Sequence, residues 1–295
     1  MIVIGSRGSQ LALWQARHIA SCLEKLGVET RLEIIKTTGD KITDVPLAQV
    51  GGKGLFTKEI EDALLAGTID LAVHSLKDMP TGLPTGLTLA AIPEREDPRD
   101  ALIGKPLAEL SAGSKVGTSS LRRAAQLHAL GRELVIENLR GNVDTRLRKL
   151  DEGQYDAIVL AAAGLRRLGW ADRIRELIEP DIMCPAAGQG ALAIETRDDG
   201  GAGHEIARKL DHASTNAAVT AERALLAKLE GGCQVPIGAH AHFEGSALYL
   251  IAMVASPDGT RVMRDTASGT GDPAALGKEL GERMLAAGAR DILGS

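Results

Sequence analysis

Aromatic residues are nearly absent from this chain, which has only two each of Trp, Tyr and Phe among 295 residues. Proteins that bind single-stranded nucleic acid stack bases on aromatic side chains, so this scarcity argues against a nucleic-acid partner. Cysteine is scarce as well, and an odd total of three argues against a disulfide framework. Free thiols are typical of a reducing compartment, so we expect a cytoplasmic protein.

Long apolar segments are also missing. The most apolar candidate considered, residues 157–165, has nine uncharged residues, about half of what a membrane-spanning helix requires. The first seven residues lack the basic segment and the long apolar segment of a signal peptide, so we expect neither membrane association nor secretion. With 44% hydrophobic and 25% charged residues, the composition is that of a folded globular protein, and the length allows about two domains or three small ones.

The net charge of −5 is unevenly distributed along the chain. Residues 115–175 hold twelve Lys and Arg against seven Asp and Glu, a net charge of +5, so the remainder carries −10. Ten of the twelve cations are arginine, whose planar guanidinium group pairs with carboxylate or phosphate oxygens two at a time. This excess of arginine, without aromatic residues, predicts a small polyanionic ligand.

Short β-branched segments alternate with helical patterns, which is typical of an α/β fold with mostly parallel sheets. An alternating segment near the C-terminus, with the helix before it, predicts a small α+β third domain. Residues 93–100 hold two prolines and six charged residues, so we expect an exposed crossing between domains there, and a second crossing at 185–190. The expected strands are 2–4, 29–36, 71–74, 115–116, 157–160 and 247–254, and the expected helices are 9–26, 57–66, 121–130 and 216–229.

Two glycine-rich segments follow the first strands. In Gly-Ser-Arg-Gly-Ser at residues 5–9, backbone N–H groups, the Ser9 hydroxyl and Arg7 are placed to bind an anion at a helix N-terminus. The alternative is a tight turn in which Ser9 caps the helix and Arg7 is solvated. Val-Gly-Gly-Lys-Gly at residues 50–54 predicts either a mobile lid over a site or a plain flexible loop. Neither segment matches a complete dinucleotide or phosphate-loop fingerprint.

The segment 69–80 runs from an apolar strand into His74, Ser75, Lys77 and Asp78 and ends at Pro80. Ligands of open α/β sheets usually bind at the carboxyl ends of the strands, where these polar groups lie. If the chain is extended there, the two adjacent charged side chains point apart and only one faces a pocket. A carboxylate at that place is suited to relay protons and to stabilise a cationic substrate. The alternative is a salt bridge at the end of the strand.

Val-Gly-Thr-Ser-Ser-Leu-Arg-Arg at residues 116–123 repeats the pattern of strand, hydroxyl residues and helix. Arg122 and Arg123 fall in the first helical turn, where a positive charge opposes the helix dipole at a cost of up to about 1 kcal/mol. A nearby anion would offset this cost, and such local conflicts are expected at functional sites. Arg140 and Arg146 lie around an N-cap expected at Asn142 or Asp144. Each arginine alone also fits a solvated surface charge.

Cys233 differs from the other two cysteines because it follows Gly231-Gly232, which ends a helix, and therefore lies on a loop. A helix C-terminus disfavours a thiolate, and no histidine lies within six residues, so Cys233 is poorly suited to act as a nucleophile in every turnover. A thiol that is alkylated once, as a permanent thioether, fits better. We expect Cys22 and Cys184 to be inert, small hydrophobic residues.

Taken together, these segments resemble the porphobilinogen deaminase family. The resemblance implies two similar α/β domains of the periplasmic-binding-protein type (type II), comprising residues 1–93 with 188–210 and residues 97–187. It also implies a small α+β domain over residues 213–295. The matching stretches occur in order and end at Gly238. They are Gly-Ser-Arg-Gly-Ser-Gln-Leu-Ala-Leu-Trp from Gly5, Gly-Gly-Lys-Gly-Leu-Phe from Gly51, Ala-Val-His-Ser-Leu-Lys-Asp-Met-Pro from Ala72, Gly-Thr-Ser-Ser-Leu-Arg-Arg from Gly117, Arg-Gly-Asn-Val-Asp-Thr-Arg from Arg140 and Leu-Glu-Gly-Gly-Cys-Gln-Val-Pro-Ile-Gly from Leu229.

The activity implied by this resemblance is that of a transferase of tetrapyrrole and haem biosynthesis. It condenses four porphobilinogen molecules head to tail, releases ammonia at each addition and yields linear hydroxymethylbilane. The primer is a dipyrromethane cofactor, whose thioether falls by match on Cys233, and the catalytic aspartate falls on Asp78. Phe56 would stack on a pyrrole, and Lys53 would belong to the lid. The residues that would bind the acetate and propionate groups are Arg7, Ser9, Lys77, Thr118, Ser119, Ser120, Arg122, Arg123, Arg140, Arg146, Arg167 and Gln189.

Two rival interpretations use the same residues. A non-catalytic anion-binding module of this fold would need a secretion signal and would have no use for Cys233. A phosphate-handling α/β enzyme would need one of the two incomplete fingerprints. We therefore expect a cytoplasmic, monomeric enzyme that binds porphobilinogen and requires no metal.

Overall fold

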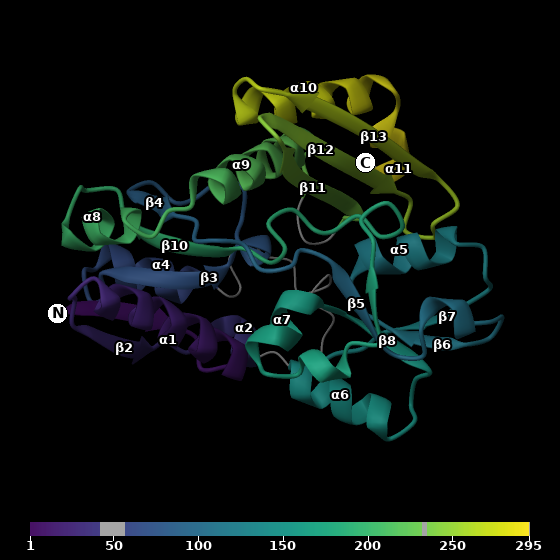
Figure 1. Cartoon of the computed structure of the whole chain (residues 1–295), viewed down its shortest axis with the longest axis horizontal. Helices are drawn as coiled ribbons and strands as arrows, with labels where there is room; N and C mark the ends of the chain where they lie inside the picture. The colour runs from purple at the N-terminus through teal and green to yellow at the C-terminus, as the bar shows by residue number, and fades with distance from the viewer. Residues whose placement is uncertain (42–56, 232–234, 295) are drawn as a thin grey trace. The chain divides into compact units, whose positions relative to one another are not determined.

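The computed structural model describes residues 1–41, 57–231 and 235–294 (Figure 1). The chain forms two compact units, Met1–Arg95 with Ala191–Asn216 and Glu96–Gly190 with Ala217–Ser295. It passes from one unit to the other after Arg95, after Gly190 and within helix α9 (Ala213–Lys228). The finer division into three domains stays a prediction.

The first unit contains a five-stranded sheet in which four strands run parallel and one runs antiparallel. β1 (Ile2–Ser6) pairs in parallel with β2 (Thr30–Ile34) and β3 (Leu71–Ser75). β10 (Leu192–Arg197) lies antiparallel between β3 and β4 (Leu87–Ala91), so the order is β2-β1-β3-β10-β4. The strands expected at 2–4, 29–36 and 71–74 are confirmed.

Helix α1 (Gln10–Lys25) covers one face of this sheet. It begins after Ser9, whose hydroxyl oxygen accepts a hydrogen bond from the Ala12 N–H at 3.3 Å, the N-cap geometry anticipated for this residue. Apolar residues at helical spacing, Ala16, Ile19 and Leu23, are fully buried against the sheet. The carboxyl end of β1 is therefore followed at once by the N-terminus of a well-anchored helix.

Helix α4 (Lys58–Leu65) covers the opposite face, because Ile60 and Leu64 pack on Ala72, whose neighbours Leu71 and Val73 pack on the α1 side. The other helices of this unit are α2 (Thr38–Lys41) and α8 (Ala202–Arg208).

The sheet of the second unit repeats the strand order of the first. β6 (Lys115–Gly117) pairs in parallel with β7 (Val135–Glu137) and β8 (Ala157–Ala161). β5 (Asp100–Gly104) lies antiparallel between β8 and β9 (Glu176–Ile178), which gives the order β7-β6-β8-β5-β9. Two α/β sheets of the same topology confirm the expected fold class. The helices are α5 (Leu121–Ala129), α6 (Val143–Asp151) and α7 (Ala162–Arg167), with the short turns η2 (Leu107–Glu109) and η3 (Ala171–Arg173).

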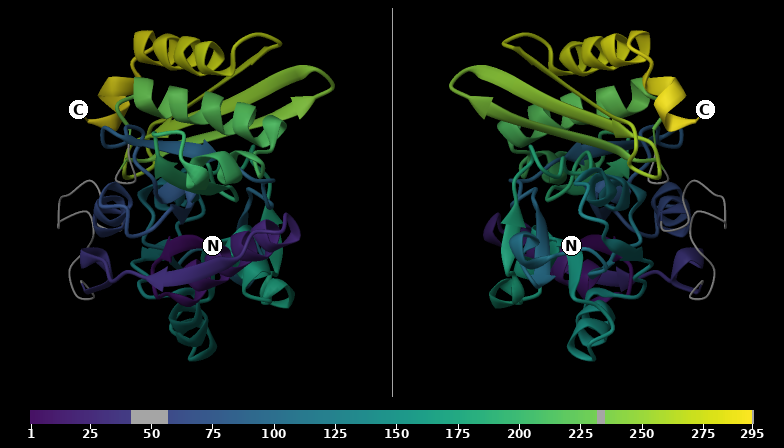
Figure 2. Two further views of the ribbon diagram at one scale, coloured as in Figure 1. Left: turned by 90° about the vertical axis from the view of Figure 1, so that its left-hand side faces the viewer. Right: turned by 90° about the vertical axis from the view of Figure 1, so that its right-hand side faces the viewer.

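A third sheet, also in the second unit, is antiparallel, with the order β11-β12-β13. Its core includes Leu250 and Val254 of β12 together with Leu225 of α9 and Leu280 of α10. Helices α9 and α10 lie side by side (Figure 2), as a small antiparallel α+β domain requires. The bounds are β11 (Ile237–Glu244), β12 (Ala247–Ala255), β13 (Val262–Gly269), α10 (Pro273–Ala286) and α11 (Ala289–Leu293).

The chain crosses between the units within the segment 93–100, as expected, but the segment is not exposed as its charges suggested. Only Glu94 within it is exposed, and Asp100 has no exposed surface. Asp97 forms ion pairs with Arg99 at 2.8 Å and with Arg166 at 3.0 Å, which explains how the charges are accommodated. Among the described residues, no helix is both long enough and apolar enough to cross a membrane.

Candidate active site

A pocket in the first unit lies where β1 and β3 end and α1 begins. Polar groups from β3, from α1 and from the turn between β1 and α1 line it. Its position at the carboxyl ends of parallel strands is the usual place for a ligand in an α/β sheet. The N-terminus of α1 adds backbone N–H groups that favour an anion. The lining residues are Arg7, Ser9, Leu11, Ala12, Gln15, Thr57, Val73, His74, Ser75, Asp78 and Met79.

Asp78 lies in a short 3-10 helix, η1 (Leu76–Asp78), directly after β3. Buried Leu76 and Met79 fix this turn, and the Leu76 N–H donates to the Ala191 carbonyl oxygen at 3.0 Å. Asp78 itself is exposed and lines the pocket, whereas Lys77 is half-buried and is not part of the lining. The expectation of an extended chain at these two residues was wrong, because helical turning rather than strand alternation separates their directions.

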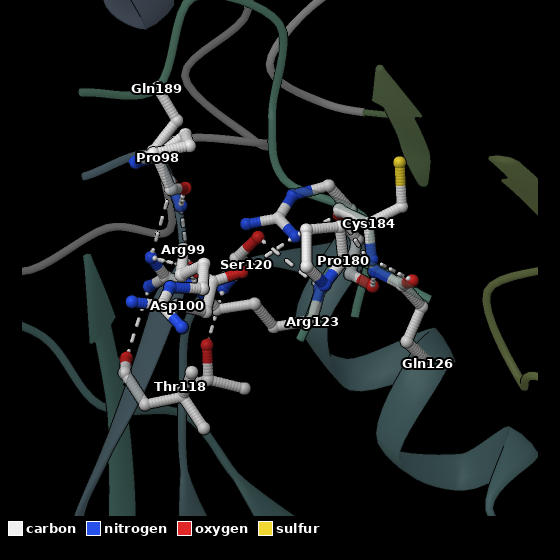
Figure 3. A network of polar contacts seen from close by, with 12 residues as sticks. Pro98, Arg99, Asp100, Thr118, Ser120, Arg123, Gln126, Pro180, Cys184 and Gln189 are labelled. Carbon is white, nitrogen blue, oxygen red and sulfur yellow. Dashed lines mark hydrogen bonds and ion pairs between the residues drawn. The ribbon is translucent and has the colours of Figure 1, made fainter. Parts of the chain in front are cut away.

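In the second unit, Arg122 and Arg123 converge on the carboxylate of Asp100. Figure 3 shows Arg123 and Asp100 within this network of polar contacts. Arg122 Nη1 lies 2.8 Å from Oδ2, and Arg123 Nη2 lies 2.7 Å from Oδ1. The Gln189 amide donates to Oδ1 at 2.9 Å and to the Pro98 carbonyl oxygen at 2.7 Å. The conflict with the helix dipole did indicate an anion, and the nearest one is a side chain of the protein itself.

Burial alone would raise the pKa of Asp100, but the two guanidinium groups outweigh it and hold that pKa far below its usual range. Both arginines are nearly buried, at 5% and 6% exposed. Sequence reasoning missed Asp100 because it is the last residue of the segment that was expected to be exposed. The sequence feature that could have indicated its burial is its position directly before the apolar segment Ala101–Leu102–Ile103.

The hydroxyl residues before α5 form the turn that aims these arginines. The Thr118 hydroxyl accepts from the Ser120 N–H at 3.2 Å, and the Ser120 hydroxyl caps the helix by accepting from the Arg123 N–H at 3.4 Å. Ser119 between them is exposed. The Ser119 hydroxyl is therefore open to a ligand, while the Thr118 and Ser120 hydroxyls stabilise the backbone of the turn.

The remaining predicted arginines lie in the same unit. Arg140 and Arg146 are half-buried, and Arg146 Nε donates to the Gly141 carbonyl oxygen at 2.8 Å. Arg167 is nearly buried and donates to the Gly190 carbonyl oxygen at 2.6 Å, and burial lowers its pKa to about 10. Asn142, one of the two expected N-cap residues, is confirmed by position at the start of α6.

Three predicted residues, Lys53, Phe56 and Cys233, lie outside the described residues. The other two cysteines are free thiols. Cys184 is fully buried, and burial raises the pKa of its thiol to about 12, which agrees with the small hydrophobic residue expected there. Cys22 is half-buried in α1, with Sγ 3.9 Å from His18 Nε2.

Comparison with known proteins gives two family matches along the chain. Residues 2–205 match the model of "Porphobilinogen deaminase, dipyromethane cofactor binding domain", and residues 216–286 match "Porphobilinogen deaminase, C-terminal domain". The chain belongs to the porphobilinogen deaminase family. It therefore carries a dipyrromethane cofactor-binding domain, and its family is one of transferases in tetrapyrrole biosynthesis. The second match also extends the family likeness well past Gly238, where the motifs had ended.

Relatives in the porphobilinogen deaminase family cover nearly the whole chain. The chain is 54% identical to porphobilinogen deaminase of Syntrophobacter fumaroxidans, over 99% of this chain and 97% of the relative. It is 55% identical to those of Trichlorobacter lovleyi and Geobacter sulfurreducens, over 98% of this chain and 95% and 93% of the relatives. A non-catalytic binding module is not favoured by these matches.

Solved structures with a similar chain path include a periplasmic substrate-binding protein of an ABC transporter from Coxiella burnetii. It is 12% identical and has a TM-score of 0.45, with 76% of this chain and 97% of that chain covered. A nutrient-binding protein from Burkholderia cenocepacia bound to methionine is 13% identical and has a TM-score of 0.42, with 70% of this chain and 90% of that chain covered. These scores are low, and the fold assignment rests on the strand order itself.

The described donors suit an acidic dipyrrole. Serine and threonine hydroxyls, helix N-termini and guanidinium groups are the groups that bind carboxylates. They occur at the N-terminus of α1 in the first unit and of α5 in the second. Within the described ranges, no three His, Cys, Asp or Glu side chains form a group able to hold a metal ion.

Proposed function

We propose that this chain joins four porphobilinogen molecules head to tail on a dipyrromethane primer held as a thioether by Cys233, and that it releases one ammonia at each addition. In the last step water cleaves the bond to the primer and supplies the hydroxyl group of the released hydroxymethylbilane. Membership of the family and the pocket that contains Asp78 together carry this proposal. The bound primer supplies the pyrrole ring to which the first substrate is joined.

Asp78 is the proposed catalytic residue. Its carboxylate is exposed in a pocket that also holds Arg7 and Ser9, so a substrate can reach it while these two groups bind an acidic side chain. A carboxylate there accepts a hydrogen bond from the pyrrole N–H and stabilises the positive charge that develops as the amine departs. Buried residues on both sides of Asp78 keep it in place, as catalytic geometry requires.

The other polar residues are proposed to bind the acetate and propionate groups of the primer and substrate. Their guanidinium groups and hydroxyls suit carboxylates, and the local charge of +5 over residues 115–175 attracts them. Phe56 and Lys53 keep their proposed roles in stacking and in the lid. The set comprises Arg7, Ser9, Lys77, Thr118, Ser119, Ser120, Arg122, Arg123, Arg140, Arg146, Arg167 and Gln189.

Location and assembly complete the proposal. The scarcity of cysteine and the lack of an apolar segment of membrane-spanning length support a cytoplasmic enzyme. We propose a monomer organised in three domains, 1–93 with 188–210, 97–187 and 213–295.

Intact-mass measurement of the denatured protein tests the primer. The parent protein should be heavier than its sequence mass by two pyrrole units, and Cys233→Ser should have the bare sequence mass. Cys184→Ser, the matched control at a buried thiol, should keep the adduct. An unmodified parent that still forms hydroxymethylbilane would contradict the proposal.

Asp78→Asn tests the catalytic residue, because the amide keeps the shape and removes the charge. We expect kcat for porphobilinogen to fall by about 10²–10⁴, with the melting temperature close to that of the parent. A matched control is Asp70→Asn on the same segment before β3. A variant at Asp78 that consumed substrate at the parental rate would assign the role to another group.

A further inference from the structure

The side-chain amide of Gln126 belongs to a buried polar network in the second unit. Gln126 lies in α5, four residues after Arg122 and on the same side of the helix, and is 2% exposed. Its Oε1 accepts hydrogen bonds from the Cys184 N–H at 2.8 Å and from Arg264 Nη2 of β13 at 3.0 Å. Its Nε2 donates to the carbonyl oxygens of Cys184 (Figure 3) and Arg122, each at 3.2 Å. The amide therefore uses both of its donors and both of its acceptor positions.

Cys184 lies in a stretch of backbone that needs such partners. Residues 183–185 are buried and belong to neither a helix nor a strand. Buried backbone N–H and carbonyl groups outside regular structure must be paired by other groups. The Gln126 amide pairs with the N–H and with the carbonyl group of Cys184, as a neighbouring strand would, and so fixes the direction of that carbonyl group. Arg264 supports the same stretch by donating to the Ile182 carbonyl oxygen at 2.9 Å.

The Cys184 carbonyl group in turn holds Arg122. Arg122 Nη1 donates to this carbonyl oxygen at 2.5 Å and lies 2.8 Å from Asp100 Oδ2. In the part of the chain that the structure describes, Nε and Nη2 of Arg122 form no hydrogen bond. Three of the five N–H groups of this guanidinium therefore remain for a ligand.

The neighbouring arginine is used differently. Arg123 donates from Nε and Nη2 to Asp100 Oδ1, at 3.0 and 2.7 Å, and from Nη1 to the Val159 carbonyl oxygen at 3.0 Å. All three of its guanidinium nitrogens are thus bound to the protein. Of the two arginines, Arg122 is the one with two nitrogens available to a carboxylate.

We propose that Gln126 is a positioning residue for carboxylate binding: by fixing the Cys184 carbonyl group, it holds the Arg122 guanidinium with Nη1 bound to the protein and with Nε and Nη2 available to a carboxylate of the primer or substrate. Two adjacent N–H donors match the two oxygens of a carboxylate. This inference rests on the proposed role of Arg122. It also gives a function to Arg264, which lies in the third sheet beyond the motifs of the sequence.

The consequence concerns binding rather than the chemical step. A guanidinium group that is not held in advance must be ordered when the ligand binds, and this ordering weakens the complex. The acetate and propionate groups take no part in bond making, so the loss is equal in the ground state and in the transition state. Such a loss changes KM and leaves kcat nearly constant.

Gln126→Met tests this, because methionine keeps the length of the side chain and removes all four hydrogen bonds. Intact mass gives the fraction of protein with the pyrrole adduct, and kcat for porphobilinogen is divided by that fraction. If Arg122 holds a substrate carboxylate, KM should rise about tenfold. If it holds a primer carboxylate, the adduct should be found on less than about half of the protein. In both cases kcat of the loaded enzyme should stay within about twofold.

Arg264→Met is a second variant, which removes one donor to the Gln126 amide and leaves both bonds between Gln126 and Cys184. It should change the same quantity in the same direction by about two- to threefold, so the test stands if Gln126→Met folds poorly. Arg264→Lys keeps a donor and should restore most of the parental value. Parental KM and adduct in both methionine variants would overturn the proposal.

Ser114→Ala is the matched control for a loss of stability in the same unit. The buried Ser114 hydroxyl accepts from the Ser111 N–H at 3.0 Å, outside the network of Gln126. This variant should lower the melting temperature and keep the parental KM and adduct. If Gln126→Met behaved in the same way, or lost only kcat, Gln126 would have a merely structural role. A parent that carries no pyrrole adduct and consumes no porphobilinogen would instead refute the proposed function.

Discussion

Asp100 shows what a single buried charge does in this protein. It joins two guanidinium groups and the Gln189 amide at the start of β5, so its ionisation is tied to the folded state. The sequence pointed to an anion near Arg122 and Arg123, because their place in the first helical turn is unfavourable. It did not reveal the partner, since Asp100 lies more than twenty residues earlier and pairing between distant segments is not encoded locally.

Asp100→Asn should destabilise the second unit by about 3–5 kcal/mol at pH 7, because two buried cations lose their counter-charge. Folding lowers the pKa of Asp100, so its contribution is present above the unfolded pKa of about 3.9 and is lost as pH falls toward the folded value. The difference between parent and variant should therefore shrink below about pH 4. Urea unfolding at several pH values measures it.

The control for that prediction is Asp156→Asn, the same substitution at a partly exposed ion pair with Lys105 at 2.7 Å. Exposed pairs contribute about 1 kcal/mol or less, so this variant should lose little stability. Equal losses of unfolding free energy in Asp100→Asn and Asp156→Asn would contradict the prediction that burial makes the Asp100 ion pairs the stronger ones.

Alkylation of the thiols is a second test at the scale of single residues. Native protein treated with iodoacetamide at pH 8 should be labelled at Cys22 and not at Cys184, because burial raises the pKa of the Cys184 thiol to about 12 and shields it. Denatured protein should take two labels, since the proposed thioether blocks Cys233. Peptide mass mapping counts them, and three labels on denatured, active enzyme would contradict the thioether.

At the scale of elements, the helices that follow a capping serine were predictable and α10 was not. Ser9 and Ser120 mark the starts of α1 and α5, and both side chains accept the expected backbone hydrogen bond. Helix α10 contains Gly277 and Gly281, which weaken the helical pattern. Glycine is needed at residue 277 because α9 packs too closely there for a side chain. A Cβ added at Gly277 would lie 2.1 Å from the Ala221 carbonyl oxygen of α9. Local propensity cannot reveal such a contact.

Gly277→Ala should therefore destabilise the protein by about 1–3 kcal/mol, although alanine favours helices by about 1 kcal/mol over glycine. The added methyl group meets backbone that cannot move aside. Gly281→Ala, one turn later, meets Cβ and Cγ of Lys228 at 2.9 Å, a milder overlap than a backbone oxygen at 2.1 Å, so it should destabilise the protein less than Gly277→Ala does. Thermal unfolding compares the two, and an equal or larger loss in Gly281→Ala would contradict the close approach of α9 at Gly277.

At the scale of the whole molecule, alternating strands and helices predicted the α/β class, and the arginine motifs placed the candidate residues on the correct elements. The antiparallel strands β5 and β10 were not predicted as such. Each is inserted between strands that come from elsewhere in the chain, and nothing in its own residues specifies direction. The contact between His74 Nε2 and Glu195 Oε2, at 3.0 Å, was missed for the same reason, because it depends on the pairing of β3 with β10.

Charge distribution supports a last prediction at this scale. The chain has a net charge of −5, yet residues 115–175 carry +5, so an acidic substrate is attracted by part of the protein and repelled by the rest. Since salt screens such fields over about 10 Å at 0.1 M, we expect kcat/KM for porphobilinogen to fall at least about threefold between 20 and 300 mM NaCl. kcat should change less, because chemistry follows binding. Potassium glutamate at equal ionic strength should lower kcat/KM by the same factor. A decrease seen only with chloride would indicate that chloride ions bind where the substrate carboxylates bind, rather than that salt screens the charges.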